Sequence, residues 1–151
     1  KKLENDEFDD PKSGWPVGKS EFAKSGLFAH AGYENGKFFI KNEFGGWSSH
    51  RSSKARPYTN FVCQVEARLL DSPASYWCLG FGSDDRRIGV NVLINGEGHF
   101  RVAYSPYGDI ISGIFLSGTH SAIKKGKEFN TVTTILRERR LEIYVNGIAI
   151  C

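Results

Sequence analysis

The stretch from Arg87 to Tyr104 constrains the fold of this chain more than any other. Two runs of alternating apolar and polar residues meet at Asn95-Gly96-Glu97-Gly98, where the glycines can adopt the positive φ that tight turns require. The apolar positions fall on one face of each run, at Ile88, Val90, Val92 and Ile94, and then at Phe100, Val102 and Tyr104. This pattern predicts an antiparallel β-hairpin with one buried face.

Similar alternation recurs along the rest of the chain. Tyr58–Leu70 is the clearest strand, and Tyr76–Gly82 places Trp77, Leu79 and Phe81 on one face. Ile110–Leu116 carries isoleucine on both faces, which predicts a strand covered on both sides by a second layer or a loop. Further strands are expected around the turn Tyr33-Glu34-Asn35-Gly36 and at Phe129–Leu136, Leu141–Val145 and Ile148–Cys151. About ten strands and no clear helix predict an all-β sandwich or barrel.

Length and charge narrow the class of protein. The 151 residues suffice for one domain with a sizeable core, and a second domain is not expected. A net charge of +3 is too balanced to indicate a nucleic acid as partner. Two basic clusters fall where turns are expected and lack interleaved aromatic residues: Lys124, Lys125 and Lys127, and Arg137, Arg139 and Arg140. No apolar run approaches the roughly 18 to 20 residues of a membrane span, so no membrane insertion is expected.

The three cysteines, Cys63, Cys78 and Cys151, cannot form a complete disulfide framework. A single disulfide between Cys63 and Cys78 is one interpretation, because their strands could be neighbours. Free thiols at core positions are the favoured interpretation. The chain has no methionine and ends within an expected strand, which indicates a domain excised from a larger protein. No signal peptide decides the compartment, and an extracytoplasmic location is slightly favoured.

Five segments carry a further signal: DEFDDPKSGWPVG, YENGKFFI, NFVCQVEARL, YWCLGFGSDD and LEIYVNGIAI. In this order they resemble small jelly-roll domains of the concanavalin A-like lectin/glucanase superfamily, and most of all its laminin-G-like and 3-keto-disaccharide hydrolase-type members. The resemblance spans nearly the whole chain. It implies a single domain over residues 1–151, with two antiparallel sheets packed as a concanavalin A-like jelly-roll sandwich. Lectins, carbohydrate-binding modules, adhesion domains and glycosidases share this fold, so activity does not follow from it.

The sequence lacks the carboxylates of laminarinase-type glycosidases. In those enzymes one strand carries E-x-D-x-x-E or E-x-D-x-E, which aims a nucleophile and an acid into the cleft. Glu7-Phe8-Asp9 has the first spacing, but Pro11 and Lys12 stand where the next acid is required. No catalytic residue is therefore assigned. A glycoside-processing domain of the keto-sugar hydrolase type stays as an alternative, because no short motif defines it.

Carbohydrate recognition requires an aromatic ring for the apolar face of a sugar and planar polar side chains for its hydroxyls. Asn91 and Arg101 occupy outward positions of the central hairpin, with aromatic residues near them in the sequence or in loops. The predicted ligand site comprises six residues: Trp77, Asn91, Arg101, Tyr104, Tyr107 and Trp47. The competing interpretation makes Trp77 a core residue and leaves Asn91 and Arg101 as ordinary exposed positions.

Asp84 and Asp85 lie in an expected turn and would suit the oxygen ligation of calcium, which the resemblance places at the rim of laminin-G-like domains. A plain charged turn is the competing interpretation, and calcium is the only cofactor considered. The four histidines show no zinc spacing with the cysteines. We therefore expect a non-catalytic recognition module of a larger bacterial protein, with a glycan or a neighbouring domain as its partner. A structural or protein-docking module is the remaining alternative.

Overall fold

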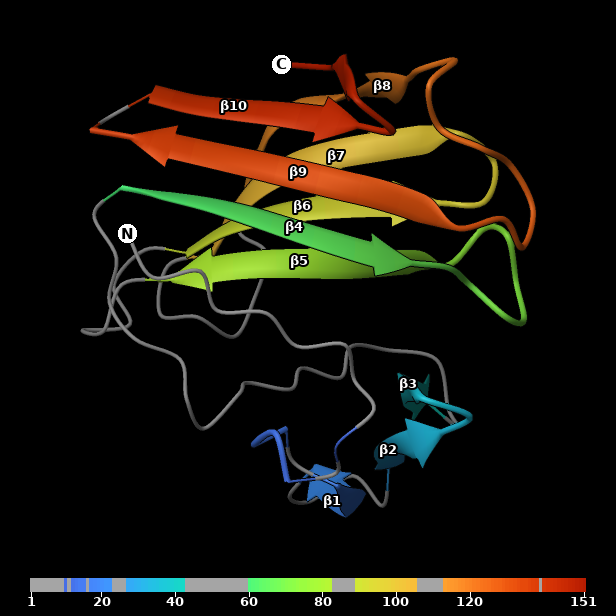
Figure 1. The fold of residues 1–151 in the computed structure, drawn as a ribbon. Coiled ribbons are helices and arrows are strands. Elements are labelled where there is room, and N and C mark those ends of the chain that lie inside the picture. Colours follow the sequence, from blue (N-terminus) through green and yellow to red (C-terminus); the bar gives the residue numbers. More distant parts are fainter. Residues whose placement is uncertain are drawn as a thin grey trace. The chain divides into compact units, whose positions relative to one another are not determined.

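A computed structural model of the chain describes residues 10, 12–15, 17–22, 27–42, 60–82, 89–105, 113–138 and 140–151. The chain divides into two compact units, Lys1–Arg56 and Pro57–Cys151, and both are built from antiparallel strands (Figure 1). The residues described here include no helix, and so none long and apolar enough to cross a bilayer. The all-β prediction is confirmed, and the single domain over residues 1–151 stays a prediction.

The first unit contains a three-stranded sheet in the order β1-β2-β3, with strands Gly18–Phe22, Leu27–Glu34 and Lys37–Asn42. Asn35 and Gly36 connect β2 to β3 with φ values of 51° and 68°, so the predicted Asn-Gly hairpin is confirmed. Aromatic rings pack beside this hairpin. The centroid of Phe38 lies 5.4 Å from that of Trp15 and 5.2 Å from that of Tyr33.

The second unit is a sandwich of two four-stranded antiparallel sheets. One sheet has the order β5-β6-β7-β8, with strands Tyr76–Gly82, Gly89–Asn95, His99–Ser105 and Gly113–Thr119. The other has the order β11-β10-β9-β4, with strands Ile148–Ala149, Arg140–Val145, Asn130–Arg137 and Phe61–Ala67. Figure 1 shows this second sheet in front of the first. The predicted two-sheet antiparallel sandwich is confirmed.

The core lies between the two sheets, where alternate residues of each strand point inward. The buried core residues of the strands are Val92, Ile94, Phe100, Val102, Val132, Ile143 and Val145. The rings of Phe61 and Phe81 join β4 to β5 with centroids 5.0 Å apart. Ala122 and Ile123 complete the core from a segment in which the sequence shows no strand pattern.

The prediction of a single buried face is wrong for the middle of the central hairpin. Leu93 and Ala103 point away from the core, yet their exposed fractions are only 1% and 0%. Polar Asn91 and Arg101 give this face a mixed pattern, and alternation does not reveal that a mixed face is covered. The outer face of β6 and β7 is therefore closed at its centre.

The prediction that Ile110–Leu116 is covered on both sides is wrong for its described part. β8 is the edge strand of its sheet, and Ile114, Phe115 and Leu116 are 52%, 66% and 39% exposed. Val102 pairs with Leu116 and Ala103 pairs with Ile114, so Phe115 is the extra residue of a β-bulge. The bulge breaks the alternation on which the prediction rests. Ile110 and Ile111 lie outside the described residues.

Three asparagines fix the loops at one end of the sandwich. Asn95 Oδ1 accepts hydrogen bonds from two backbone N–H groups of its own turn, at 2.8 and 3.0 Å. Asn130 Nδ2 donates to the carbonyl of Lys124 at 2.9 Å, and Asn146 Nδ2 donates to that of Ala122 at 2.7 Å. Since these carbonyls belong to the loop that completes the core, the asparagines hold that loop in place.

Candidate functional site

The structure divides the residues of the predicted ligand site between two faces of one sheet. Asn91 and Arg101 lie on the outer face of β6 and β7, as predicted. Trp77 packs against the core from β5, in agreement with the competing interpretation, and Tyr104 lies on the same inward side. Four other predicted residues lie outside the described residues: Trp47, Tyr107 and the calcium-turn pair Asp84 and Asp85. The described ranges contain no group of three or more histidine, cysteine or carboxylate side chains suited to a metal ion.

Asn91 and Arg101 are engaged by their neighbours on the outer face. The thiol of Cys78 donates to Asn91 Oδ1 at 3.5 Å, and a Cβ at Gly80 would lie only 2.9 Å from the same oxygen. The guanidinium carbon of Arg101 lies 4.7 Å from the ring centroid of Tyr76, a cation–π contact. Together with the buried residues between them, these contacts leave no open platform at the centre of this face.

The ring of Tyr104 packs against residues of the edge strand β8 and does not belong to the predicted ligand site. Its ring stacks with that of Phe115 at a centroid distance of 5.2 Å. A Cβ on Gly113 would come within 2.0 Å of Tyr104 Cε1, so the ring occupies the space that a larger residue at 113 would need. Tyr104 therefore does not share a surface with Asn91 and Arg101.

All three cysteines are free, and Cys63 and Cys78 belong to different sheets. The favoured interpretation of free thiols is confirmed, although only Cys63 points toward the core. Burial raises the pKa of the Cys63 thiol, and it raises that of Cys78 to about 12. The solvent-accessible area of Cys78 nevertheless makes it an exposed residue. Reagents can therefore reach this thiol, but few molecules carry it as the reactive thiolate at neutral pH.

The outer face of the other sheet carries a polar row that the sequence interpretation missed. The register aligns Tyr144 of β10 with Thr133 of β9, and Thr133 with Gln64 of β4. Gln64 Nε2 donates to Thr133 Oγ1 at 3.0 Å. These three residues are called the Tyr144 row. Gln64 is exposed and the other two are half-buried, so the row lies on the molecular surface.

Glu142 holds Tyr144 from the neighbouring outward position of β10. The phenol O–H donates to Glu142 Oε2 at 2.9 Å, and Arg140 Nε lies 3.4 Å from Glu142 Oε1. The hydrogen bond to this carboxylate, and then its negative charge, raise the pKa of Tyr144. The ring is therefore a neutral phenol that is anchored on the sheet surface.

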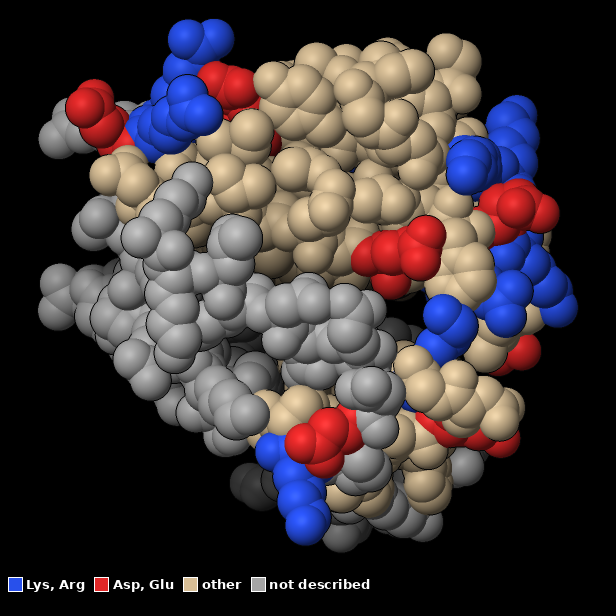
Figure 2. Space-filling view, viewed as in Figure 1, with Lys and Arg blue, Asp and Glu red and all other residues tan. Residues whose placement is uncertain are grey.

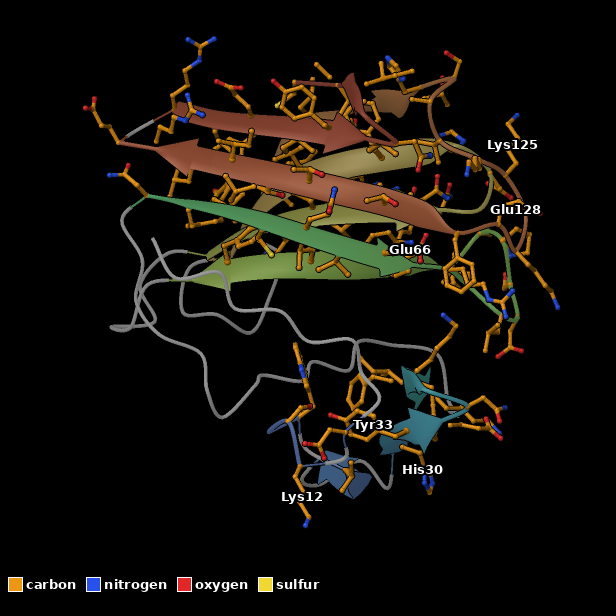
Figure 3. All side chains as sticks on the ribbon, in the orientation of Figure 1. Lys12, His30, Tyr33, Glu66, Lys125 and Glu128 are labelled. Atoms are coloured by element: carbon orange, nitrogen blue, oxygen red, sulfur yellow. The ribbon has the colours of Figure 1, made fainter. Side chains whose placement is uncertain are left out.

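Figure 2 shows the front of this sheet as mostly uncharged, with basic and acidic groups gathered toward its ends. Charged residues occur around the turn between β9 and β10 (Arg137, Glu138 and Arg140) and in the loop before β9 (Lys124, Lys125, Lys127 and Glu128). Figure 3 shows Lys125 and Glu128 at one end and Glu66 on β4. Glu66 is exposed on the same face as the Tyr144 row.

The carboxylates of this face do not form a glycosidase pair. Glu142 aligns through Ile135 with Val62, so two strand spacings and four residues separate it from Glu66. This corresponds to roughly 16 Å. Retaining and inverting glycosidases require about 5 to 9.5 Å. The face offers binding groups, and this pair offers no glycosidase chemistry.

A hollow of about 480 Å³ lies at the end of the sandwich that the asparagines fix. It is lined by Glu97, Gly98, Thr119, His120, Ser121, Ile123 and Lys125. His120 Nδ1 accepts a hydrogen bond from the backbone N–H of Ala122 at 3.1 Å, so a neutral imidazole carries its proton on Nε2. Among the described residues of this lining there is no tryptophan, tyrosine or phenylalanine. The described lining therefore offers no ring for the apolar face of a sugar.

No family model, no curated protein and no solved structure matches the chain. The resemblance to concanavalin A-like domains consequently rests on the sequence segments that carry it. The structure supports its coarser part, an all-β fold with antiparallel sheets packed as a sandwich. The chemistry of the surfaces is the remaining basis for a functional assignment.

Proposed function

We propose that this chain is a non-catalytic carbohydrate-recognition module of the concanavalin A-like jelly-roll type, with the Tyr144 row as its ligand-contacting surface. The alignment of Tyr144, Thr133 and Gln64 on an exposed sheet face carries this proposal. A pyranose presents an apolar face to an aromatic ring, and its hydroxyls bind amide and hydroxyl groups. Each residue of the row supplies one of these partners.

The row indicates a neutral glycan as the ligand. It crosses two strand spacings, or about 10 Å, which suits a short stretch of glycan chain. The row itself has no charged side chain, and Glu142 beside it is paired with Arg140, so the row offers no unpaired cation to an anionic ligand. Because Glu142 fixes the phenol of Tyr144, the ring is ordered before a ligand arrives, which reduces the entropic cost of binding.

Binding of the 151-residue chain to a broad glycan panel, with and without calcium, tests the proposal. Tyr144→Ala and Gln64→Ala should weaken binding by at least about tenfold, since each removes a direct contact. Tyr76→Ala and Arg101→Ala are the matched controls, because they lie on the outer face of the opposite sheet. These controls should bind as the unmodified chain does.

A loss of binding in Arg101→Ala, with Tyr144→Ala unaffected, would move the site back to the central hairpin. Binding to no glycan at all would contradict carbohydrate recognition. The second candidate is then a protein-docking module, which the exposed apolar residues Ile114, Phe115 and Leu116 favour.

A further inference from the structure

The chain contains three asparagines that are followed directly by glycine, and each pair lies in a turn between two strands: Asn35-Gly36, Asn95-Gly96 and Asn146-Gly147. The backbone nitrogen of the residue after an asparagine can attack the carboxamide carbon, Cγ, of that asparagine. A side chain on this next residue hinders the attack, and glycine has none. The three pairs therefore share the same local chemistry, and the fold determines which of them can react.

In the Asn95 pair, both reacting groups are held by the fold. Asn95 is only 3% exposed, and its Oδ1 accepts hydrogen bonds from the backbone N–H groups of Glu97 and His99 at 3.0 and 2.8 Å. The nitrogen of Gly96, which would have to attack, donates to the carbonyl of Pro73 at 2.8 Å. The attack therefore requires the turn to open first.

In the Asn146 pair, the carboxamide is held through both its nitrogen and its oxygen. Nδ2 donates to the carbonyl of Ala122 at 2.7 Å and to Asn130 Oδ1 at 2.8 Å, and Oδ1 accepts a hydrogen bond from the backbone N–H of Thr131 at 3.0 Å. Asn146 is also half-buried. Its Cγ can turn toward the next nitrogen only when these hydrogen bonds break.

The Asn35 pair has neither restraint. Glu34 pairs with Lys37, so Asn35 and Gly36 alone connect β2 to β3, and the ladder takes no hydrogen bond from Gly36. Both residues of the connection are exposed. Within the described part of the chain, neither the carboxamide of Asn35 nor the N–H of Gly36 has a hydrogen-bond partner. The reaction therefore requires only bond rotations within an exposed turn.

We propose that Asn35 is a site of spontaneous deamidation in the folded protein, and that the fold protects Asn95 and Asn146 from the same reaction. The nitrogen of Gly36 forms a bond to Asn35 Cγ, and the bond from Cγ to Nδ2 breaks. Ammonia leaves with the proton of the Gly36 N–H. Water then opens the resulting succinimide ring at one of its carbonyl carbons, which yields aspartate or isoaspartate.

The modification alters the turn between β2 and β3. Both products place a new carboxylate next to that of Glu34. Isoaspartate also routes the backbone through the former side chain, so it adds a carbon atom to a connection of only two residues. The longer connection no longer matches the pairing of Glu34 with Lys37. The Tyr144 row belongs to the other unit, so this inference does not rest on the proposed glycan binding.

Incubation of the 151-residue chain in heavy-oxygen water at mildly alkaline pH tests the proposal. The water that opens the ring leaves its oxygen in the new carboxylate, so mass spectrometry of proteolytic peptides gives the rate at each asparagine. We expect Asn35 to react at least about tenfold faster than Asn95 and Asn146, because these two must first break hydrogen bonds. A smaller ratio, or a faster reaction at Asn95 or Asn146, would overturn the proposal.

Two controls separate the effect of the fold from that of the sequence. In guanidinium chloride, which unfolds the chain, the three rates should converge, because glycine follows each asparagine. If the same order of rates persists in the unfolded chain, neighbouring residues set it and the structural argument fails. Gly36→Ala should slow the reaction at Asn35 alone, since the new Cβ shields the attacking nitrogen and meets no atom within 4 Å. An unchanged rate would exclude Gly36 as the nucleophile, and if this variant fails to fold, the rates of the unmodified chain decide.

Discussion

The two sheets of the sandwich differ in what their outer faces offer. On the β5–β8 sheet, Leu93 and Ala103 are buried although they point away from the core. On the sheet formed by β4, β9, β10 and β11, Val62 and Gln64 are exposed at outward positions of the edge strand β4, and Thr133 on the central strand β9 is half-buried. Pointing outward on a strand is therefore not the same as being available to a ligand. At its centre, the face that carries the Tyr144 row is the more accessible of the two.

The comparison also shows where a polar pattern misleads. Asn91 and Arg101 alternate with core residues as ligand-binding residues would, yet each contacts a neighbour on a face whose central residues, Leu93 and Ala103, are buried. Gln64 and Thr133 follow the same alternation on an accessible face. Exposure of the residues between the polar ones separates these cases, and that exposure depends on what packs on the sheet.

The largest expected effect comes from truncating one apolar residue on each outer face. Leu93→Ala should lower the free energy of unfolding by about 2 to 5 kcal/mol, because it leaves a cavity around a buried side chain. Val62→Ala should cost less than about 1 kcal/mol, because Val62 is 54% exposed and loses mainly strand propensity. Urea unfolding of both variants measures the difference. Equal small losses would mean that the two outer faces are equally open.

The next largest effect is slow alkylation of two thiols, one from each sheet. A thiol with a pKa of about 12, as in Cys78, should react with iodoacetamide at pH 8.5 roughly tenfold to a hundredfold more slowly than an ordinary thiol. Cys63 should also react slowly, because burial raises its pKa too. Mass spectrometry of the alkylated peptides, with the exposed Cys151 as internal reference, gives the rates.

The same shift predicts a loss of stability in alkali. The pKa of Cys78 is higher in the folded state than in the unfolded state, so the folded state holds the proton more tightly. The stabilisation of the folded state that results is complete at a pH below about 8.5, the pKa of the thiol in the unfolded chain. It falls as the pH rises toward about 12. In Cys78→Ala the urea midpoint should depend less on pH over this range. Rapid alkylation of native Cys78 at pH 8.5 would contradict both expectations.

Sequence alternation predicts the strands well because burial of every second residue is a local property. Tyr76–Gly82 and the turn at Asn95-Gly96 occur as predicted. The same alternation places Trp77 on one face of its strand with Leu79 and Phe81. This pattern alone already indicates that Trp77 points toward the core and Asn91 away from it. In contrast, the Tyr144 row depends on the pairing of β4 with β9, whose partners lie about seventy residues apart. Local pattern does not determine such register.

The alternation in LEIYVNG does place Glu142 and Tyr144 on one face of a strand, and this is the signal from which the site could have been found. It does not indicate which residues lie beside them on β9 and β4. The edge position of β8 has the same origin, because strand order is a property of the assembled sheet. Local alternation therefore predicts the strands and the fold class. It does not predict the surfaces, because these depend on the pairing of strands that lie far apart in the sequence.

The smallest expected effect tests the anchoring of the Tyr144 ring. The chain has six tyrosines, so the phenolate absorbance of the unmodified chain minus that of Tyr144→Phe isolates the ionisation of Tyr144. We expect this difference to titrate above the usual pKa of about 10, because the Glu142 carboxylate accepts the phenol O–H and repels the phenolate. In a Glu142→Gln background the same difference should titrate at lower pH. An unchanged titration would mean that Glu142 does not hold the ring, and the ordered platform of the open face would lose its physical basis.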